Sequence, residues 1–211
     1  MNSTLSPRQL ESLENDGYVV VETSKIPLGQ QLINISELRK LSKRLYQQQY
    51  FKTATIGALK NTETTQEIRN DFTLWIDAEK WPQGLTDSET ETLKKYCRFL
   101  TQTQETLRNY FRLSLNSYET HFAIYPKGHF YKKHVDQTAQ NNHRYFSFVL
   151  YLNEDWSLID GGNLVGYKDQ NKIFDILPKG HNFIVFQSSI EHEVLPTLKE
   201  RYSITGWFRN D

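Results

Sequence analysis

A histidine and an aspartate separated by one residue, His134-Val135-Asp136, could form two thirds of a metal site. In a β-strand, side chains two positions apart point to the same face of the sheet. If residues 131–136 are extended, the imidazole of His134 and the carboxylate of Asp136 therefore project together, and Val135 faces the core. The triplet alone is weak evidence, because short motifs of this kind recur by chance.

A second histidine could complete the site. Two histidines and one carboxylate on one side of an ion leave the opposite coordination positions open, which is the facial arrangement of non-haem Fe(II) sites. His192 lies 58 residues after His134, just after a predicted strand that ends near Phe186. In a jelly roll, a residue at that separation can return to the same end of the barrel. His192 is therefore the candidate third ligand.

An arginine lies at a spacing that suits the binding of a carboxylate. Arg201 follows His192 by nine residues, with Pro196 in the connection. Two strands joined by a short turn would place the guanidinium deeper in the same barrel. There it could bind a carboxylate through two parallel hydrogen bonds.

Two sets of strand residues would share the space around this arginine. The residues that alternate with Arg201 along its strand are Ser203, Thr205 and Trp207. The residues that share one face of the strand over 144–152 are Tyr145, Ser147, Val149 and Tyr151. The phenol of Tyr151 could donate to the carboxylate that Arg201 binds. An Fe(II) site with open positions can take a 2-oxo acid and dioxygen together, so 2-oxoglutarate, with its second carboxylate, fits this set.

The composition suits one soluble domain. With 211 residues, 12 Tyr, 12 Phe and 4 Trp, the chain can bury a sizeable core. Lys+Arg and Asp+Glu balance at 25 each, which gives no basic excess for nucleic-acid binding. No apolar run approaches the ~20 residues of a membrane span, and the polar N-terminus lacks the apolar segment of a secretory signal. We expect a cytoplasmic protein with no nucleic-acid or membrane partner.

The first 115 residues predict mainly helices. Ser6 with Gln9, and Ser88 with Glu91, have the spacing of a helix capping box. Cys97 has no metal or nucleophile spacing around it, and as the single cysteine it excludes an intrachain disulfide. The elements expected here are a helix from Pro7 to Gly17, a strand over Tyr18–Glu22, a helix over Gly29–Gln49, a strand with a mobile loop over 50–66, a strand over Glu67–Asp77 and a helix from Ser88 to about Leu113.

After Leu115 the pattern changes to short alternating runs separated by turn signals such as Pro126-Lys127-Gly128 and Gly161-Gly162. This spacing predicts a β-sandwich or small barrel. The expected strands are Tyr118–Tyr125, Phe130–Asp136, Arg144–Leu152, Leu164–Tyr167, Lys172–Ile176, Phe183–Phe186 and Arg201–Phe208.

Several segments of this region resemble one family. They are YPKGHFYKKHVD, YFSFVLYLNEDW, DGGNLVGY and HEVLPTLKERYSITGWF. They are similar to the 2-oxoglutarate- and Fe(II)-dependent prolyl hydroxylases, in the branch that includes the hypoxia-inducible-factor prolyl hydroxylases and their bacterial relatives. The resemblance covers at least 118–208. It also takes in 68–75, which resembles the family's Arg-Gly-Asp…Trp strand, although Asn70 replaces the usual glycine and leaves the local backbone conformation open.

The resemblance implies roles for individual residues. His134, Asp136 and His192 would bind iron, and Arg201 and Tyr151 would hold the 5-carboxylate of 2-oxoglutarate. The residues expected to line the rest of the pocket are Tyr125, Leu164, Val194, Thr205 and Trp207. Those expected near the substrate entrance are Arg69, Asp71 and Arg144, of which Asp71 and Arg144 would pair, and the stretch 50–66 would close over the substrate.

Plainer interpretations stay open for some of these residues. Arg144 and Asp71 could form ordinary surface ion pairs, and Tyr125 and Trp207 could be simple core residues. The remaining histidines have no ligand spacing that improves on the chosen pair, and we expect surface or loop positions for them. They are His121, His129, His143 and His181.

By the resemblance, the chain is one α+β domain over 1–211. Residues 116–211 would form a double-stranded β-helix core of the jelly-roll or cupin type, and residues 1–115 would supply helical support, substrate-side strands and a loop. The implied activity uses Fe(II), 2-oxoglutarate and O2, and leaves open a role for ascorbate. The implied substrate is a prolyl residue of a protein, with elongation factor Tu as a candidate, and the carboxylate of Asp136 favours hydroxylation over halogenation. The alternatives are the same chemistry on a free amino acid or other small molecule, and a non-catalytic sensor or binding module.

Overall fold

The strands form two antiparallel sheets. The computed structural model describes residues 3–26, 32–55, 66–138 and 142–211. The larger sheet runs, in spatial order, β1 (Tyr18–Glu22), β9 (Asn182–Gln187), β6 (Arg144–Tyr151), β11 (Arg201–Arg209), β4 (Ser117–Tyr125), β3 (Phe72–Ile76) and β2 (Lys52–Thr53). The smaller runs β5 (Tyr131–His134), β10 (Glu191–Val194), β7 (Leu164–Lys168) and β8 (Asn171–Ile176). The strands after Leu115 thus divide four and four between two sheets, as in a double-stranded β-helix.

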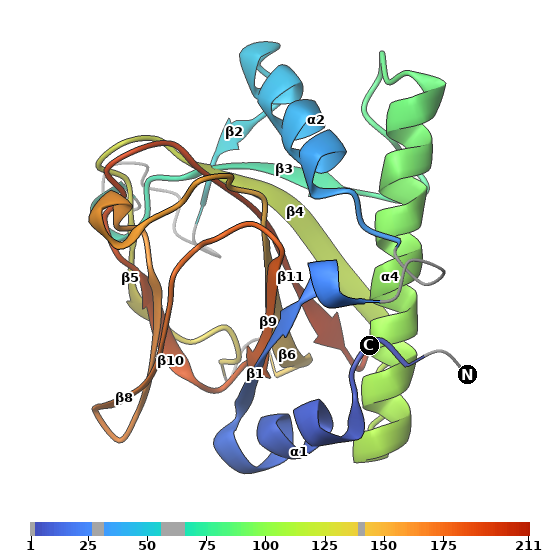
Figure 1. Ribbon diagram of the computed structural model, residues 1–211, viewed down its shortest axis with the longest axis vertical. Coiled ribbons are helices and arrows are strands. Elements are labelled where there is room, and N and C mark those ends of the chain that lie inside the picture. The colour runs from blue at the N-terminus through green and yellow to red at the C-terminus, as the bar shows by residue number, and fades with distance from the viewer. Residues whose placement is uncertain (1–2, 27–31, 56–65, 139–141) are drawn as a thin grey trace.

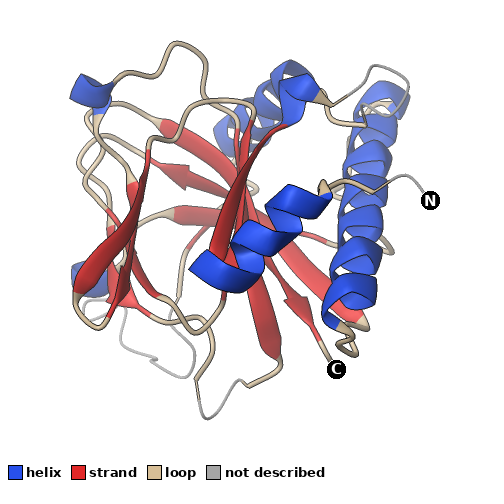
Figure 2. Ribbon diagram, turned by 60° about the horizontal axis from the view of Figure 1, so that its bottom comes forward, coloured by secondary structure: helices blue, strands red, loops and turns tan. Residues whose placement is uncertain are grey.

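Three helices cover one face of the larger sheet (Figures 1 and 2). They are α1 (Pro7–Asp16), α2 (Ile35–Gln47) and α4 (Asp87–Phe111), and short 3-10 turns occur at Thr23–Lys25 and Leu158–Asp160. Fully buried residues such as Leu38 and Leu100 of the helices pack with Phe148 and Phe208 of the sheet in one apolar cluster. The expected arrangement of helices at the front of the chain and a β-core at the back is confirmed. Among the described residues, no helix is both long and apolar enough to cross a membrane.

Helix α1 forms as its sequence predicts. The backbone N–H of Ser6 donates to the side chain of Gln9 at 2.8 Å, and that of Gln9 donates to the Ser6 hydroxyl at 3.4 Å. Such a cap stabilises a helix by about 1 kcal/mol. Gly17 ends the helix at a φ of 80°, a left-handed conformation that glycine adopts without strain.

The predicted N-terminal cap of α4 is wrong. The helix is capped by Thr86, whose hydroxyl accepts from the backbone N–H of Glu89 at 3.2 Å, and not by Ser88. Two overlapping boxes compete in this sequence. The first prevails because Arg44 of α2 also holds Glu89 through two hydrogen bonds, of 2.8 and 2.7 Å. The helix ends at Phe111, slightly before the expected Leu113.

Two other boundaries in the first half also differ. Helix α2 begins at Ile35, because the Asn34 side chain accepts from the backbone N–H of Glu37 at 3.2 Å and caps it there. The strand expected over 67–77 begins only at Phe72, and residues 66–68 are helical. Of the stretch 50–66, Lys52–Thr53 forms β2, whereas 56–65, where most of the expected closing loop falls, lies outside the described residues.

The strand predicted to carry both His134 and Asp136 is too long. β5 ends at His134, and Val135 is 38% exposed instead of facing the core. The ladder stops because the backbone N–H groups of Asp136 and Gln137 both donate to the carbonyl of Ser188, at 3.2 and 2.9 Å. The two presumed ligands therefore do not share one strand face.

β10, the strand that carries His192, was not predicted. Its sequence, Glu191-His192-Glu193-Val194, lacks an apolar alternation, and the predicted position of His192 is after a strand and not within one. In the structure His192 and Val194 are the buried positions and the two glutamates point outward. The polar residue on the inner face hides the strand pattern.

Candidate metal centre and carboxylate pocket

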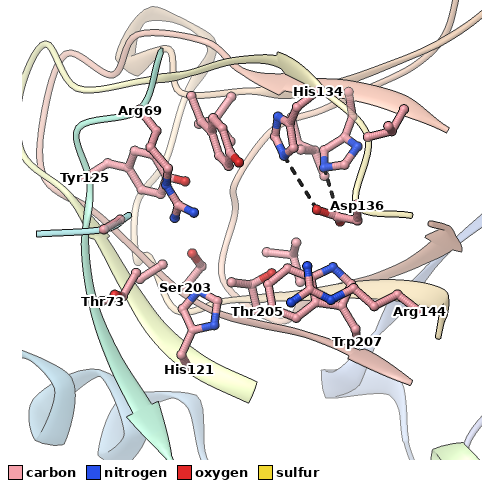
Figure 3. Close-up of a pocket in the computed structure, with 18 of the residues that line it drawn as sticks. Arg69, Thr73, His121, Tyr125, His134, Asp136, Arg144, Ser203, Thr205 and Trp207 are labelled. Carbon is pink, nitrogen blue, oxygen red and sulfur yellow. Dashed lines mark ion pairs between the residues drawn. The ribbon is translucent and has the colours of Figure 1, made fainter. Parts of the chain in front are cut away.

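The structure brings His134, Asp136 and His192 together at one end of the smaller sheet. His134 and His192 are direct neighbours across the β5–β10 pair. The Nε2 atom of His134 lies 3.7 Å from Oδ1 of Asp136, and that of His192 lies 3.4 Å from Oδ2 (Figure 3). One donor atom from each residue falls within 4.8 Å of the other two. A single ion between the three would meet two nitrogens and one oxygen.

Both histidines present a free Nε2 to that point. Nδ1 of His134 lies 2.7 Å from the carbonyl oxygen of Lys132, and Nδ1 of His192 lies 2.9 Å from that of Ile190. A carbonyl oxygen can only accept, so each Nδ1 carries the proton. The lone pair on each Nε2 then remains available to a metal. Backbone carbonyls commonly orient metal-binding histidines in this way.

The charges of the three groups also suit a divalent metal. Burial and the neighbouring His192 lower the pKa of His134 to about 3, although Asp136 opposes them, so this imidazole is neutral near pH 7. Burial alone would raise the pKa of Asp136, but the two histidines and a hydrogen bond from Ser147 hold it below its ordinary value. Two imidazoles and one carboxylate, with the other side of the ion free, form the donor set of non-haem Fe(II) sites.

The three residues line a cavity of about 850 Å³ between the two sheets. Its floor is the inner face of the larger sheet, where side chains fall into rows across β3, β4, β11 and β6. The row at the end where Arg201 lies consists of Tyr125 and Arg201, and the next consists of Thr73, Ala123, Ser203 and Tyr151. The third row consists of Trp75, His121, Thr205 and Val149, and the last consists of Glu119, Trp207 and Ser147. Figure 3 shows this floor below the metal ligands.

Arg201 closes one end of the cavity and is only 1% exposed. Its Nε donates to the carbonyl of Gly162 at 3.0 Å, and one terminal nitrogen donates to the Ser203 hydroxyl at 3.2 Å. It forms no ion pair with the described part of the chain. A buried charge without a counter-charge is costly, so this end of the cavity favours an anion.

Tyr151 lies against the same guanidinium. The Arg201 guanidinium carbon is 5.1 Å from the centre of the Tyr151 ring and 4.8 Å from that of Tyr125. The Tyr151 hydroxyl is buried and finds no hydrogen-bond partner among the described residues, and burial raises its pKa to about 12 against the effect of Arg201. It is therefore a protonated, unused donor beside a buried cation, as a carboxylate-binding site requires.

Tyr151 itself is not among the residues that line the cavity, whereas the other residues expected in the pocket are. Those that line the cavity are Tyr125, Leu164, Val194, Thr205 and Trp207. Burial raises the pKa of Tyr125, so its phenol stays protonated as well. The hydroxyl of Thr205 donates to the carbonyl of Phe148 at 3.0 Å and is already occupied.

The expected pairing of Asp71 with Arg144 is wrong. Asp71 is fully buried, and both of its oxygens accept from Arg69, at 2.8 and 2.7 Å. Arg144 instead bonds Glu119, with its Nε at 2.7 Å from the carboxylate. Each residue pairs with a partner close to it: Arg69 is two residues from Asp71 in the chain, and Glu119 lies near Arg144 on the sheet floor. Arg69 and Arg144 line the cavity, whereas Asp71 does not.

His121 is a pocket residue, and its predicted position at the surface or in a loop is wrong. It is 2% exposed in the middle of β4, with ring centres 4.6 Å from Trp75 and 5.5 Å from Trp207. Neither ring nitrogen has a hydrogen-bond partner among the described residues. Burial, with Arg69 and Arg144 nearby, lowers its pKa to about 3. Its even spacing from Tyr125 along the strand was the signal that could have placed it on the cavity face.

Two further contacts to the metal ligands were also missed. The ring of Tyr131 stacks on that of His134 with centres 3.5 Å apart, and the guanidinium carbon of Arg69 lies 4.3 Å from the Tyr131 ring. Ser147 donates to Oδ2 of Asp136 at 2.6 Å. The alternation along 144–152 predicts Ser147 on the same strand face as Tyr151 but indicates no role for it.

Known proteins similar to this chain show its family. A family model described as the 2OG-Fe(II) oxygenase superfamily matches residues 120–209. The chain is 26% identical over 211 residues to the hypoxia-inducible factor prolyl hydroxylase of Caenorhabditis elegans. This match covers 94% of this chain and 27% of that protein. It is 31% identical over 156 residues to Egl nine homolog 1 of Rattus norvegicus, and this match covers 70% of this chain and 43% of that protein. The chain thus spans less than half the length of these curated relatives.

Solved structures agree over nearly the whole chain. A prolyl-4-hydroxylase of Pseudomonas putida shares 30% identity and a TM-score of 0.78, with 96% of this chain and 97% of that chain covered. A Trichoplax adhaerens prolyl hydroxylase, in complex with a peptide fragment of the hypoxia inducible factor oxygen degradation domain, has the same fold at 23% identity and a TM-score of 0.76, with 96% and 87% covered. The double-stranded β-helix prediction is therefore confirmed. The chain belongs to the 2OG-Fe(II) oxygenase superfamily, as a member of its prolyl hydroxylase family, whose chemistry uses Fe(II), 2-oxoglutarate and O2.

Proposed function

We propose that this chain hydroxylates a prolyl residue of a protein and converts 2-oxoglutarate and O2 to succinate and CO2 in the same turnover. One oxygen atom of O2 enters the prolyl product and the other enters succinate, so the reaction balances without a further reductant. The observation that carries the proposal is the single cavity that holds a His-Asp-His donor set on one wall and an unpaired buried arginine at its closed end.

His134, Asp136 and His192 are the proposed iron ligands. When bound, Fe(II) supplies the activation of dioxygen and the oxidising power of the reaction. The chain's part is to hold three donors on one side of the ion and to keep their protonation states fixed. The carboxylate of Asp136 fills the position that a halogenating enzyme leaves free for halide, so hydroxylation is the favoured outcome.

The closed end of the cavity is the proposed 2-oxoglutarate site. The guanidinium of Arg201 would bind the 5-carboxylate, and the unused hydroxyl of Tyr151 would donate to it. Apolar walls from Leu164 and Val194 would exclude water from this end, which strengthens both hydrogen bonds. The proposed site would thus give a counter-charge to Arg201 and a hydrogen-bond partner to the Tyr151 hydroxyl, neither of which has one among the described residues.

The open end is the proposed substrate entrance. Trp75, at the outer end of its row, is 51% exposed, and Arg69 and Arg144 both line the cavity. A loop of another protein could present a side chain there, and the Trichoplax relative, which is in complex with a peptide fragment, supports a peptide substrate. We propose an intracellular protein as the substrate, with elongation factor Tu as the candidate drawn from the family resemblance. We further propose that residues 1–211 act as one catalytic unit.

The test is succinate formation with Fe(II), 2-oxoglutarate and a bacterial protein extract or purified elongation factor Tu. Wild type should form succinate above a His134→Ala control, and mass spectrometry should find one added oxygen atom on a proline of the protein substrate. Oxygen added only to other residues, or turnover only with a free amino acid, would contradict the prolyl assignment. No turnover above the control under any of these conditions would support a non-catalytic module.

A further inference from the structure

Asp136 is held differently from the other two presumed ligands. His134 and His192 lie on hydrogen-bonded strands, whereas Asp136 lies two residues beyond the end of β5. Its backbone is fixed by one residue from the far side of the barrel. The backbone N–H groups of Asp136 and Gln137 donate to the carbonyl of Ser188, and the N–H of Ser188 donates to Tyr145 of β6 at 3.0 Å.

The side chain of Asp136 is held by the same region. The hydroxyl of Ser147 lies 2.6 Å from Oδ2 of Asp136 and 2.9 Å from the hydroxyl of Ser188. An ionised carboxylate can only accept, so the single Ser147 proton must point to Asp136. Ser188 must then donate its own proton to Ser147. The order of donation is therefore fixed, from Ser188 to Ser147 to the carboxylate.

Both serines are enclosed by the protein. Ser147 is 2% exposed and Ser188 is fully buried, so water cannot readily replace either hydrogen bond. Chains of hydrogen bonds in such surroundings strengthen one another, and a bond to a charged group is stronger than one between neutral groups. The short Ser147 contact agrees with this.

We propose that Ser147 and Ser188 are positioning residues for the metal centre, which hold the carboxylate of Asp136 against the Nε2 atoms of His134 and His192 through the hydrogen bond to its Oδ2. The proposal rests on the metal site of the proposed function. Ser147 does not touch the ion itself. Its hydrogen bond restrains rotation of the Asp136 side chain, whose backbone Ser188 already holds.

The test is metal affinity, measured on the full chain by titration with Co(II), whose visible absorption reports the geometry of its ligands. Ser147→Ala should weaken Co(II) binding about 10- to 100-fold, the usual cost of losing a hydrogen bond to a metal ligand, and should alter the visible spectrum. Ser188→Ala should cost less, because Ser147 keeps its own bond to Asp136. Ser147→Thr, which keeps the hydroxyl on a residue that suits a strand, should recover the wild-type affinity.

A matched control separates this role from simple packing. Ser42 of α2 is also fully buried, and its hydroxyl has no partner among the described residues. Ser42→Ala should leave Co(II) affinity and the spectrum unchanged. Thermal unfolding of each metal-free variant shows whether it is folded. If a Ser147 variant does not fold, a weakened Co(II) affinity of Ser188→Ala supplies the test instead.

Two results would overturn the proposal. One is a folded Ser147→Ala variant with wild-type Co(II) affinity and spectrum. The other is an equal loss of affinity in Ser42→Ala, which would mark the effect as general destabilisation. If wild type itself binds no Co(II), the metal site of the proposed function has failed, and that result is distinct from either of these.

Discussion

The two faces of the larger sheet are built for different purposes, and β11 shows this within one strand. Tyr202, Ile204 and Phe208 point to the helix-covered face, where they join the apolar cluster under α2 and α4. The alternate residues that point to the cavity face are Arg201, Ser203, Thr205 and Trp207. One face is closed by the chain's own helices. The other needs a ligand to complete it.

Hydrogen bonding separates the two faces further. Among the described residues, six buried side-chain atoms lack a hydrogen-bond partner, and four of them belong to His121, Tyr151 and Trp207 on the cavity face. The charge of Arg201 also lacks a counter-charge there. Each unsatisfied buried group costs on the order of 1–3 kcal/mol, so the cavity face lowers the stability of the ligand-free chain. We therefore predict that mutations on the helix-covered face will lower stability and leave ligand binding unchanged. Mutations on the cavity face should weaken ligand binding without a loss of stability.

The largest expected loss of stability is on the helix-covered face. Leu100→Ala removes a fully buried side chain of α4 and should lower the free energy of unfolding by about 3 kcal/mol, within the usual range for such cavities. Chemical denaturation measures this directly. Co(II) affinity of the folded variant should be unchanged, and a weakened metal site would show that the two faces are not independent.

Arg201→Met should give the reverse signature on the cavity face. Loss of the guanidinium should weaken 2-oxoglutarate binding by about 2–5 kcal/mol, the typical cost of removing one partner of a buried charge pair. The free energy of unfolding of the ligand-free variant should equal or exceed that of wild type, because an unpaired buried charge is removed. Calorimetry and chemical denaturation report the two quantities. A large loss of stability with unchanged 2-oxoglutarate binding would reverse the assignment.

His121→Met should change how stability depends on pH. The pKa of His121 is about 3 in the folded chain against an ordinary value of 6.5, so between these values the unfolded state binds more protons. Stability contributed by neutral His121 is therefore complete above pH ~6.5 and falls by up to about 1.4 kcal/mol per pH unit as the pH decreases toward 3. Denaturation at several pH values should show a shallower decline for the variant than for wild type, and identical slopes would contradict the buried neutral state.

Trp75→Ala should have the smallest effect on folding. The side chain is half exposed at the rim of the cavity, and substitutions at such positions usually change stability by less than about 0.5 kcal/mol. Its loss should appear instead as a higher KM for the protein substrate with little change in the KM for 2-oxoglutarate. Equal changes in both would place Trp75 at the co-substrate end.

The sequence predicts the elements whose signals are local. The Ser6 capping box and most of the strands after Leu115 follow from neighbouring residues, and they are close to their observed bounds. β10 was missed, because its inner face carries His192 where a core strand would carry an apolar residue. A functional residue thus removed the very pattern that identifies a strand.

The parts of the site that escaped prediction depend on contacts between distant segments. Arg144 does not pair with Asp71 because the fold places it beside Glu119, a residue from another strand of the sheet. The contact of Ser147 with Asp136 depends on where β5 ends, which Ser188 determines from more than fifty residues away. By contrast, His134, His192 and Arg201 could be chosen from the sequence because their residue types restrict the chemistry so strongly.

The most direct test of the account is whether bound metal increases the affinity of this cavity for 2-oxoglutarate. Calorimetric titration of 2-oxoglutarate should be done without oxygen on the metal-free chain, the Fe(II)-loaded chain and His134→Ala with Fe(II). We predict tight binding only to the Fe(II)-loaded wild type, since both groups would share the space between His134 and Arg201. Equal affinity in all three samples, or none in the Fe(II)-loaded wild type, would contradict the assignment of this cavity as an Fe(II)- and 2-oxoglutarate-dependent active site.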